Sequence, residues 1–146
     1  MKPIFRSLLA LSPLVFVGNA PGTTTITIDL TGLRNNTGTI YACMTAKPKA
    51  FPKKCDADPD RRTASVKASD GRQLIIRDVP AGRYAIAVLH DENGNKKMDM
   101  TLFLPKEGYG FSRDAPVKMA PPKFEAAAFD VTAGKPVRMT MKVRYI

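Results

Sequence analysis

The residues best suited to chemistry lie at the polar end of segment 83–99, RYAIAVLHDENGNKKMD. Four oxygen-bearing side chains recur there at the spacing of calcium-loop positions 1, 3, 5 and 9: Asp91, Asn93, Asn95 and Asp99. Alternating oxygens of this kind suit Ca²⁺, which takes roughly six to eight oxygen ligands. A strong calcium loop also has Gly at position 6 and Glu at position 12, where this chain has Lys96 and Leu102. The sequence therefore predicts weak calcium binding at most, and the alternative is that these side chains cap their own turns.

The same part of the chain holds residue types that hydrolases use. His90 is the sole histidine and adjoins Asp91, while Ser112 follows in the segment EGYGFSRD. Ser112 lacks the full set of glycines that surround a serine nucleophile, and alternation puts His90 at the edge of the core. We therefore expect a binding or scaffolding protein without catalytic residues, and the alternative is a hydrolase acting on envelope polymers. Such a hydrolase would gather His90 and at least two nearby Asp, Glu or Ser side chains around one water-filled pocket.

Polar and aromatic residues beyond this strand suit a contact with a ligand or partner. The predicted binding surface comprises His90, Glu107, Tyr109 and Phe111. The alternative is that Phe103, Tyr109 or Phe111 fills space over the preceding strand, where Ala85 and Ala87 leave room for a bulky ring.

Short apolar segments between turn residues predict the strands that position these groups. Six segments are expected strands, and alternation is clean in the first and the last: 24–30, 39–45, 64–68, 73–79, 83–90 and 137–144. The first two are expected to form a hairpin, and segment 83–90, apolar on both faces, is expected to be covered on both sides. Segment 100–122, with four prolines, is expected to be irregular, while 124–130 fits a helix or a short strand. The sequence predicts a single all-β sandwich of about seven strands.

The first 22 residues have the features of a secretory signal peptide. Lys2 and Arg6 precede the apolar run LLALSPLVFV, which is too short to span a bilayer, and small residues follow. We expect cleavage after Ala20 or Gly22, with an uncleaved anchor as the alternative. The predicted organisation is a signal peptide at 1–22 and a domain at 23–146, periplasmic or secreted, with no transmembrane segment once the leader is removed.

Cys43 and Cys55 are the only cysteines. In an oxidising compartment an even number of cysteines favours a disulfide. A zinc site needs about four ligands, which two cysteines and one histidine supply poorly. We therefore predict a disulfide between Cys43 and Cys55.

The chain is strongly basic, with a net charge of +10. Loss of Lys2 and Arg6 leaves 21 basic and 13 acidic residues, a net charge of +8. The basic residues are scattered and not interleaved with aromatic rings, so we expect no nucleic-acid partner. The expected partner is an envelope component: a protein, a glycan or an anionic lipid surface.

Four motifs appear in order along the chain: TGLRN, GRYAIAVLHDENGN, EGYGFS and PPKFEAAAF. In these motifs the chain resembles a bacterial family of exported proteins catalogued as domain of unknown function 2141. The resemblance implies a small exported domain with a transthyretin-like or immunoglobulin-like sandwich. The family has no established activity, so the resemblance implies no catalytic residues. One departure is Lys96, at a position that is often Gly in such loops.

Overall fold

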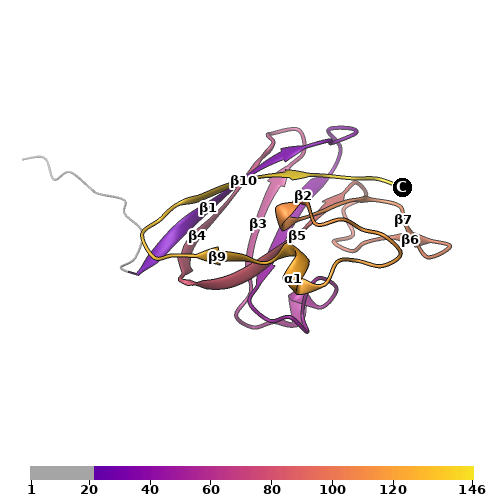
Figure 1. Cartoon of the computed structure of the whole chain (residues 1–146). Helices are drawn as coiled ribbons and strands as arrows, with labels where there is room; N and C mark the ends of the chain where they lie inside the picture. The colour runs from indigo at the N-terminus through magenta and orange to yellow at the C-terminus, as the bar shows by residue number, and fades with distance from the viewer. Residues whose placement is uncertain (1–21) are drawn as a thin grey trace, which may run out of the picture.

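In the computed structural model, which describes residues 22–146, the two larger β sheets enclose a common core (Figure 1). One sheet has the order β10-β1-β4: β10 (Val137–Lys142), β1 (Thr23–Thr31) and β4 (Gln73–Pro80). The other has the order β3-β2-β5-β8: β3 (Arg62–Lys67), β2 (Thr39–Thr45), β5 (Gly82–Asp91) and β8 (Gly108–Phe111). β9 (Phe129–Val131) pairs with the beginning of β5. The predicted all-β sandwich is confirmed, and the predicted leader lies outside the described residues except for Gly22.

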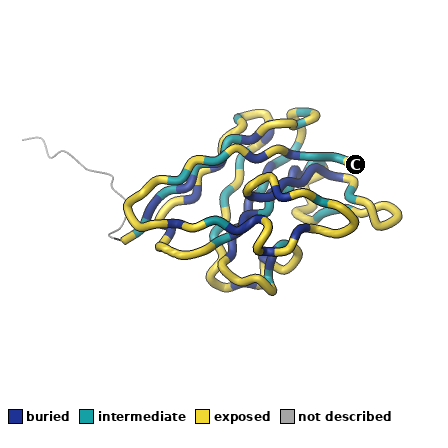
Figure 2. The backbone as a smooth tube through the Cα atoms, viewed as in Figure 1, coloured by how far each residue is buried: buried dark blue, intermediate teal, exposed yellow. Residues whose placement is uncertain are grey.

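Alternation along the strands builds the core between the two sheets. β1 buries Ile26, Ile28 and Leu30 together with Thr24 on one face, and β10 contributes Met141 from the neighbouring strand. Figure 2 shows buried residues in the strands and exposed residues mainly in the connecting loops. Each large aliphatic side chain buried in this way stabilises the fold by about 1.5–3 kcal/mol.

The expected hairpin between the first two strands is wrong. β1 pairs with β4 and β10, whereas β2 pairs with β3 and β5 in the opposite sheet. The connection of residues 32–38 crosses between the sheets, and its Leu33 packs against the core. Gly32 and Gly38 both have positive φ angles and supply the turns. Glycine-rich turn chemistry is common to hairpins and to crossings between sheets, so the sequence alone did not separate them.

β5 is covered on both faces, as its apolar pattern predicted. Ile86 and Val88 face the core between the sheets, while Ala85 lies in a second buried cluster on the other face. Tyr109 and Phe111 belong to this second cluster, so two of the three candidate rings pack there. Phe103, the third, lies elsewhere and is exposed.

Residues 100–128 contain more regular structure than expected. A small hairpin of β6 (Met100–Thr101) and β7 (Leu104–Pro105) precedes β8, and the 3-10 helix η2 (Ser112–Asp114) follows it. The ambiguous segment 124–130 has both expected forms in succession, the short helix α1 (Phe124–Ala127) and then β9. The sequence analysis did not predict β8, because that strand is short and is defined by its long-range pairing with β5.

The predicted disulfide joins Cys43 in β2 to Cys55 in the 3-10 helix η1 (Cys55–Ala57). Next to it, the buried carboxylate of Asp58 accepts hydrogen bonds from Lys47 Nζ (2.6 Å), the Thr45 hydroxyl and the Asp60 backbone N–H (3.0 Å). The ammonium of Lys47, followed by the Thr45 hydroxyl, lowers the pKa of Asp58 to about 2. The disulfide and this polar cluster hold the long loop after β2.

Stability should therefore fall in acid through Asp58. An unfolded Asp has a pKa of about 3.9, so the unfolded chain binds more protons than the folded chain between about pH 4 and pH 2. This contribution is complete above about pH 4 and is lost as the pH falls towards 2. Asp58→Asn is expected to flatten that part of the curve of unfolding free energy against pH, measured by denaturant titration. The exposed Asp56→Asn is the matched control, and an unchanged acid limb in Asp58→Asn would contradict the assignment.

Candidate functional site

Asp91, the first residue of the predicted calcium loop, is buried at the end of β5. Its two carboxylate oxygens accept backbone hydrogen bonds from Gly94 (2.9 Å) and Lys96 (2.8 Å). Lys96 has a φ of +59°, the left-handed conformation that glycine adopts at this position of a calcium loop. The loop therefore makes the turn without the glycine, and Asp91 fixes it.

The other three predicted ligands pair with one another. The Asn95 amide donates to both oxygens of Asp99 at 2.9 Å, and the Asn93 amide donates to Asp99 as well. The oxygens of Asn93 and Asn95 accept backbone N–H groups two residues further on. Within residues 22–146, no group of three or more His, Cys, Asp or Glu side chains could hold a metal ion. Asp91, Asn93 and Asn95 thus cap turns of the loop while Asp99 accepts the two side-chain amides, and calcium binding stays a prediction.

Buried Glu107 links this loop to the segment that follows it. One of its carboxylate oxygens accepts the backbone N–H of Glu92 (3.1 Å) and the other that of Asp99 (3.3 Å). The backbone N–H of Lys106 donates to the Asp99 carbonyl at 2.8 Å. Both ends of the β6–β7 hairpin are therefore fixed to the polar loop.

The four residues of the predicted binding surface, His90, Glu107, Tyr109 and Phe111, are all buried. His90 Nε2 donates to the Thr37 carbonyl at 2.7 Å, because a carbonyl oxygen only accepts, and Nδ1 lies 2.6 Å from the Tyr145 hydroxyl. These four side chains pack beneath the polar loop and its surroundings, and none of them belongs to an exposed contact surface.

The arrangement that a hydrolase would need is not formed around His90. Ser112 is buried, its hydroxyl donates to the Ala127 carbonyl at 2.6 Å, and it accepts the Ile86 backbone N–H at 2.9 Å. It therefore joins β5 to α1 and is not directed towards the histidine. One hollow among residues 22–146 is lined by residues 48–54 and 121–125 and another by residues between 47 and 59, and neither has His90 or Ser112 among its lining residues.

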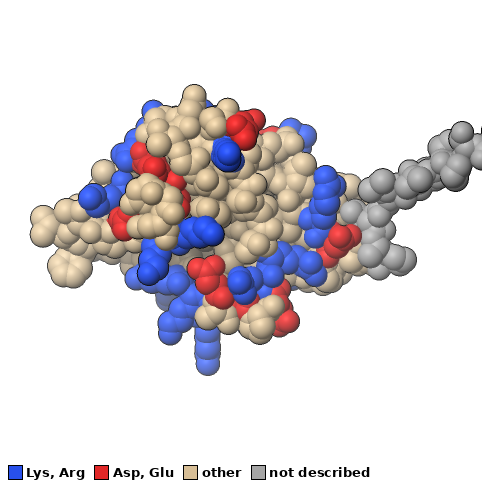
Figure 3. All heavy atoms as spheres, turned by 180° about the vertical axis from the view of Figure 1, so that it is seen from behind, with Lys and Arg blue, Asp and Glu red and all other residues tan. Residues whose placement is uncertain are grey.

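The β6–β7 hairpin projects from this end of the molecule and carries apolar side chains. Leu102 and Phe103 form its two-residue loop and are 85% and 94% exposed, and Met100 and Leu104 beside them are about half exposed. Figure 3 shows this projection without acidic or basic side chains, which lie where it joins the body. Leu102 and Phe103 have φ angles of +50° and +68°. Two-residue hairpin loops with positive φ usually contain Asn and Gly, so bulky apolar residues are there at a cost in backbone strain.

The family model described as "uncharacterized protein conserved in bacteria (DUF2141)" matches residues 28–140. The chain belongs to this family. No curated protein and no solved structure matches the chain. The match spans from β1 to β10, so the DUF2141 region includes the polar loop and the projecting hairpin as well as both sheets.

The sequence of this DUF2141 member did not lead us to predict the exposed apolar hairpin. Phe103 was considered only as one of three rings, with Tyr109 and Phe111, that could pack over Ala85 and Ala87. The available signal was the run MTLFLP next to the polar loop, where apolar residues continue without strand alternation.

Within residues 22–146, the structure contains no helix that is long and apolar enough to span a membrane.

Proposed function

We propose that this protein is an exported binding protein of the cell envelope that attaches to anionic membrane surfaces through the β6–β7 hairpin. The observation that carries the proposal is the near-complete exposure of Leu102 and Phe103 at the tip of a projecting hairpin. Soluble domains rarely expose adjoining large apolar side chains unless those side chains contact a partner or a membrane.

The size of the apolar tip supports insertion into the boundary between headgroups and acyl chains. Full burial of a Leu or Phe side chain is worth about 1.5–3 kcal/mol, so the two tip residues together supply about 3–6 kcal/mol. Phe is among the residues that interfacial membrane segments place on their apolar face. Hydrogen bonds at the base of the hairpin support the proposal further, since a fixed base lowers the entropy lost on binding.

Charge around the hairpin favours an anionic surface. Lys96, Lys97 and Lys106 are exposed beside it, and among the described residues no ion pair occupies their ammonium groups. A basic side chain near an anionic leaflet contributes about 1 kcal/mol. The carboxylates of Asp99 and Glu107 at the same base oppose this attraction, so the three lysines add at most about 3 kcal/mol to the apolar contribution, a factor of no more than about 100 in affinity.

Co-sedimentation with lipid vesicles tests the proposal. The domain of residues 23–146 should bind vesicles that contain phosphatidylglycerol at least tenfold more tightly than vesicles of phosphatidylcholine alone. Salt should weaken the difference, because it screens the lysines over a Debye length of about 8 Å at physiological ionic strength. Absence of binding to both vesicle types at low salt would refute membrane attachment.

A further inference from the structure

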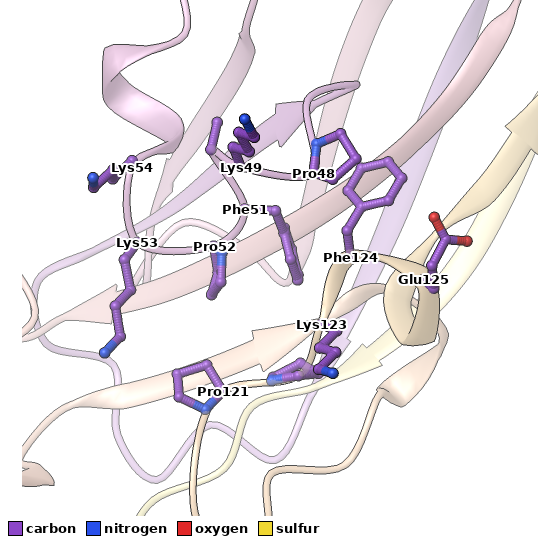
Figure 4. Close-up of a pocket in the computed structure, with 12 residues that line it drawn as sticks. Pro48, Lys49, Phe51, Pro52, Lys53, Lys54, Pro121, Lys123, Phe124 and Glu125 are labelled. Atoms are coloured by element: carbon purple, nitrogen blue, oxygen red, sulfur yellow. The ribbon is translucent and has the colours of Figure 1, made fainter.

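A hollow of about 600 Å³ lies between the loop that the disulfide closes and the beginning of α1 with the segment before it (Figure 4). Its walls come from two stretches that are far apart in the sequence, 48–54 and 121–125. This volume falls in the range of pockets that hold small ligands, roughly 300–1,000 Å³. None of its lining residues belongs to the β6–β7 hairpin, so the hollow is a separate candidate site.

Positive charge dominates the rim of the hollow. Four lysines line it: Lys49, Lys53, Lys54 and Lys123. The one acidic lining residue, Glu125, is paired with Arg83 at 3.1 Å. Both walls therefore place ammonium groups at the rim, and the resulting positive potential favours an anion.

The rest of the lining is apolar. Four proline rings contribute to it: Pro48, Pro52, Pro121 and Pro122. Phe51 and Phe124 pack edge to face with ring centroids 6.2 Å apart and are mostly buried, so they form a firm base. Phe51 also contacts Phe111 in the second buried cluster, which connects this base to β8.

The lining discriminates between classes of anionic ligand. Four of the twelve lining residues are prolines without a backbone N–H, and the N–H groups of Ala50, Phe51 and Lys54 donate within their own loop, so few groups remain to pair with a peptide backbone. The lining also lacks the Asn, Gln and Asp side chains that would pair with sugar hydroxyls. Ammonium groups and apolar rings remain, and together they match a molecule with one anionic head and an aliphatic chain.

We propose that this hollow binds a single anionic amphiphile, with its phosphate or carboxylate head between the lysines of the two walls and its aliphatic chain against the proline and phenylalanine rings. The lysine ammonium acts as a point charge that accepts either head group, so the two sources share one chemistry. The proposal goes beyond attachment to a membrane surface, because it concerns one ligand molecule held at a different place.

Calorimetric titration of residues 23–146 with monomeric dodecyl phosphate tests the proposal, with laurate as the second head group. Dodecyl phosphate should bind at least tenfold more tightly than either the neutral dodecyl maltoside or inorganic phosphate. Lys53→Gln combined with Lys123→Gln, one change on each wall, should weaken binding of dodecyl phosphate at least tenfold. Lys67→Gln combined with Lys135→Gln removes the same charge from exposed positions outside the hollow and should leave binding unchanged.

A variant with Leu102→Asn and Phe103→Gly separates this site from the hairpin, because it should still bind dodecyl phosphate. Loss of dodecyl phosphate binding in that variant would show that the amphiphile binds at the hairpin, which would overturn the proposal. Equal binding of dodecyl phosphate and inorganic phosphate, or binding of hexaglutamate in place of dodecyl phosphate, would also overturn it.

Discussion

Replacement of Leu102 by Asn and Phe103 by Gly is expected to abolish binding to anionic vesicles while leaving the domain at least as stable as the unmodified protein. Loss of the two apolar side chains removes about 3–6 kcal/mol of membrane affinity, a factor of at least 100. The left-handed conformation costs an L-residue about 1–2 kcal/mol, and Asn-Gly adopts it readily, so the free energy of unfolding should rise by about 1 kcal/mol.

Vesicle co-sedimentation and denaturant unfolding on the same samples check both halves of this expectation. Met119→Ser is the matched control, since Met119 is a fully exposed apolar residue outside the hairpin, and it should change neither quantity. Unaltered vesicle binding by the Asn-Gly variant would show that the tip is not the contact. A large loss of stability would show that Leu102 and Phe103 serve the fold instead.

Gly38→Ala is expected to destabilise the domain by about 3 kcal/mol or more. A Cβ at this position would lie 2.0 Å from the Asp91 carbonyl oxygen, and φ is +75°. The clash is with backbone, which moves only if β2 separates from β5 where they pair at Thr39 and Asp91. Denaturant unfolding measures the loss.

Gly94→Ala separates the two causes of that loss. Gly94 has a similar φ of +79°, but nothing lies within 4 Å of a Cβ placed there. It should cost only the backbone penalty of about 1–2 kcal/mol. If both substitutions cost the same, close packing between residue 38 and β5 contributes nothing.

Local patterns in the sequence predicted much of the fold. Strict alternation in β1 and β10 and the two apolar faces of β5 predicted the buried faces of these strands correctly. Successive residues of a strand point to opposite faces, so the position of a residue in the strand decides which face its side chain occupies. The assignment of β1 and β2 to different sheets depends on where the chain crosses the core. That crossing is decided by long-range contacts such as the packing of Leu33, and turn residues do not encode it.

The candidate site was predicted in part. The spacing of Asp and Asn residues in segment 91–99 predicted a polar loop. The alternative interpretation, in which these side chains cap their own turns, described its hydrogen bonds better than calcium binding did. The hydrogen bonds from the loop backbone to Glu107 join residues 8 and 15 positions apart through irregular chain, so local spacing does not determine them. The exposed tip was missed because Leu-Phe contradicts the turn preferences from which hairpins are predicted. Such a local conflict is expected where function outweighs stability.

The central claim is that the tip of the β6–β7 hairpin enters the membrane. The chain has no Trp, so Phe103→Trp places a single fluorescent reporter at the tip. We expect the emission of this variant to shift to shorter wavelength when vesicles containing phosphatidylglycerol are added, and to remain unchanged with phosphatidylcholine vesicles at the same concentration. An emission maximum that stays at the fully hydrated position while the protein co-sediments with anionic vesicles would contradict the account.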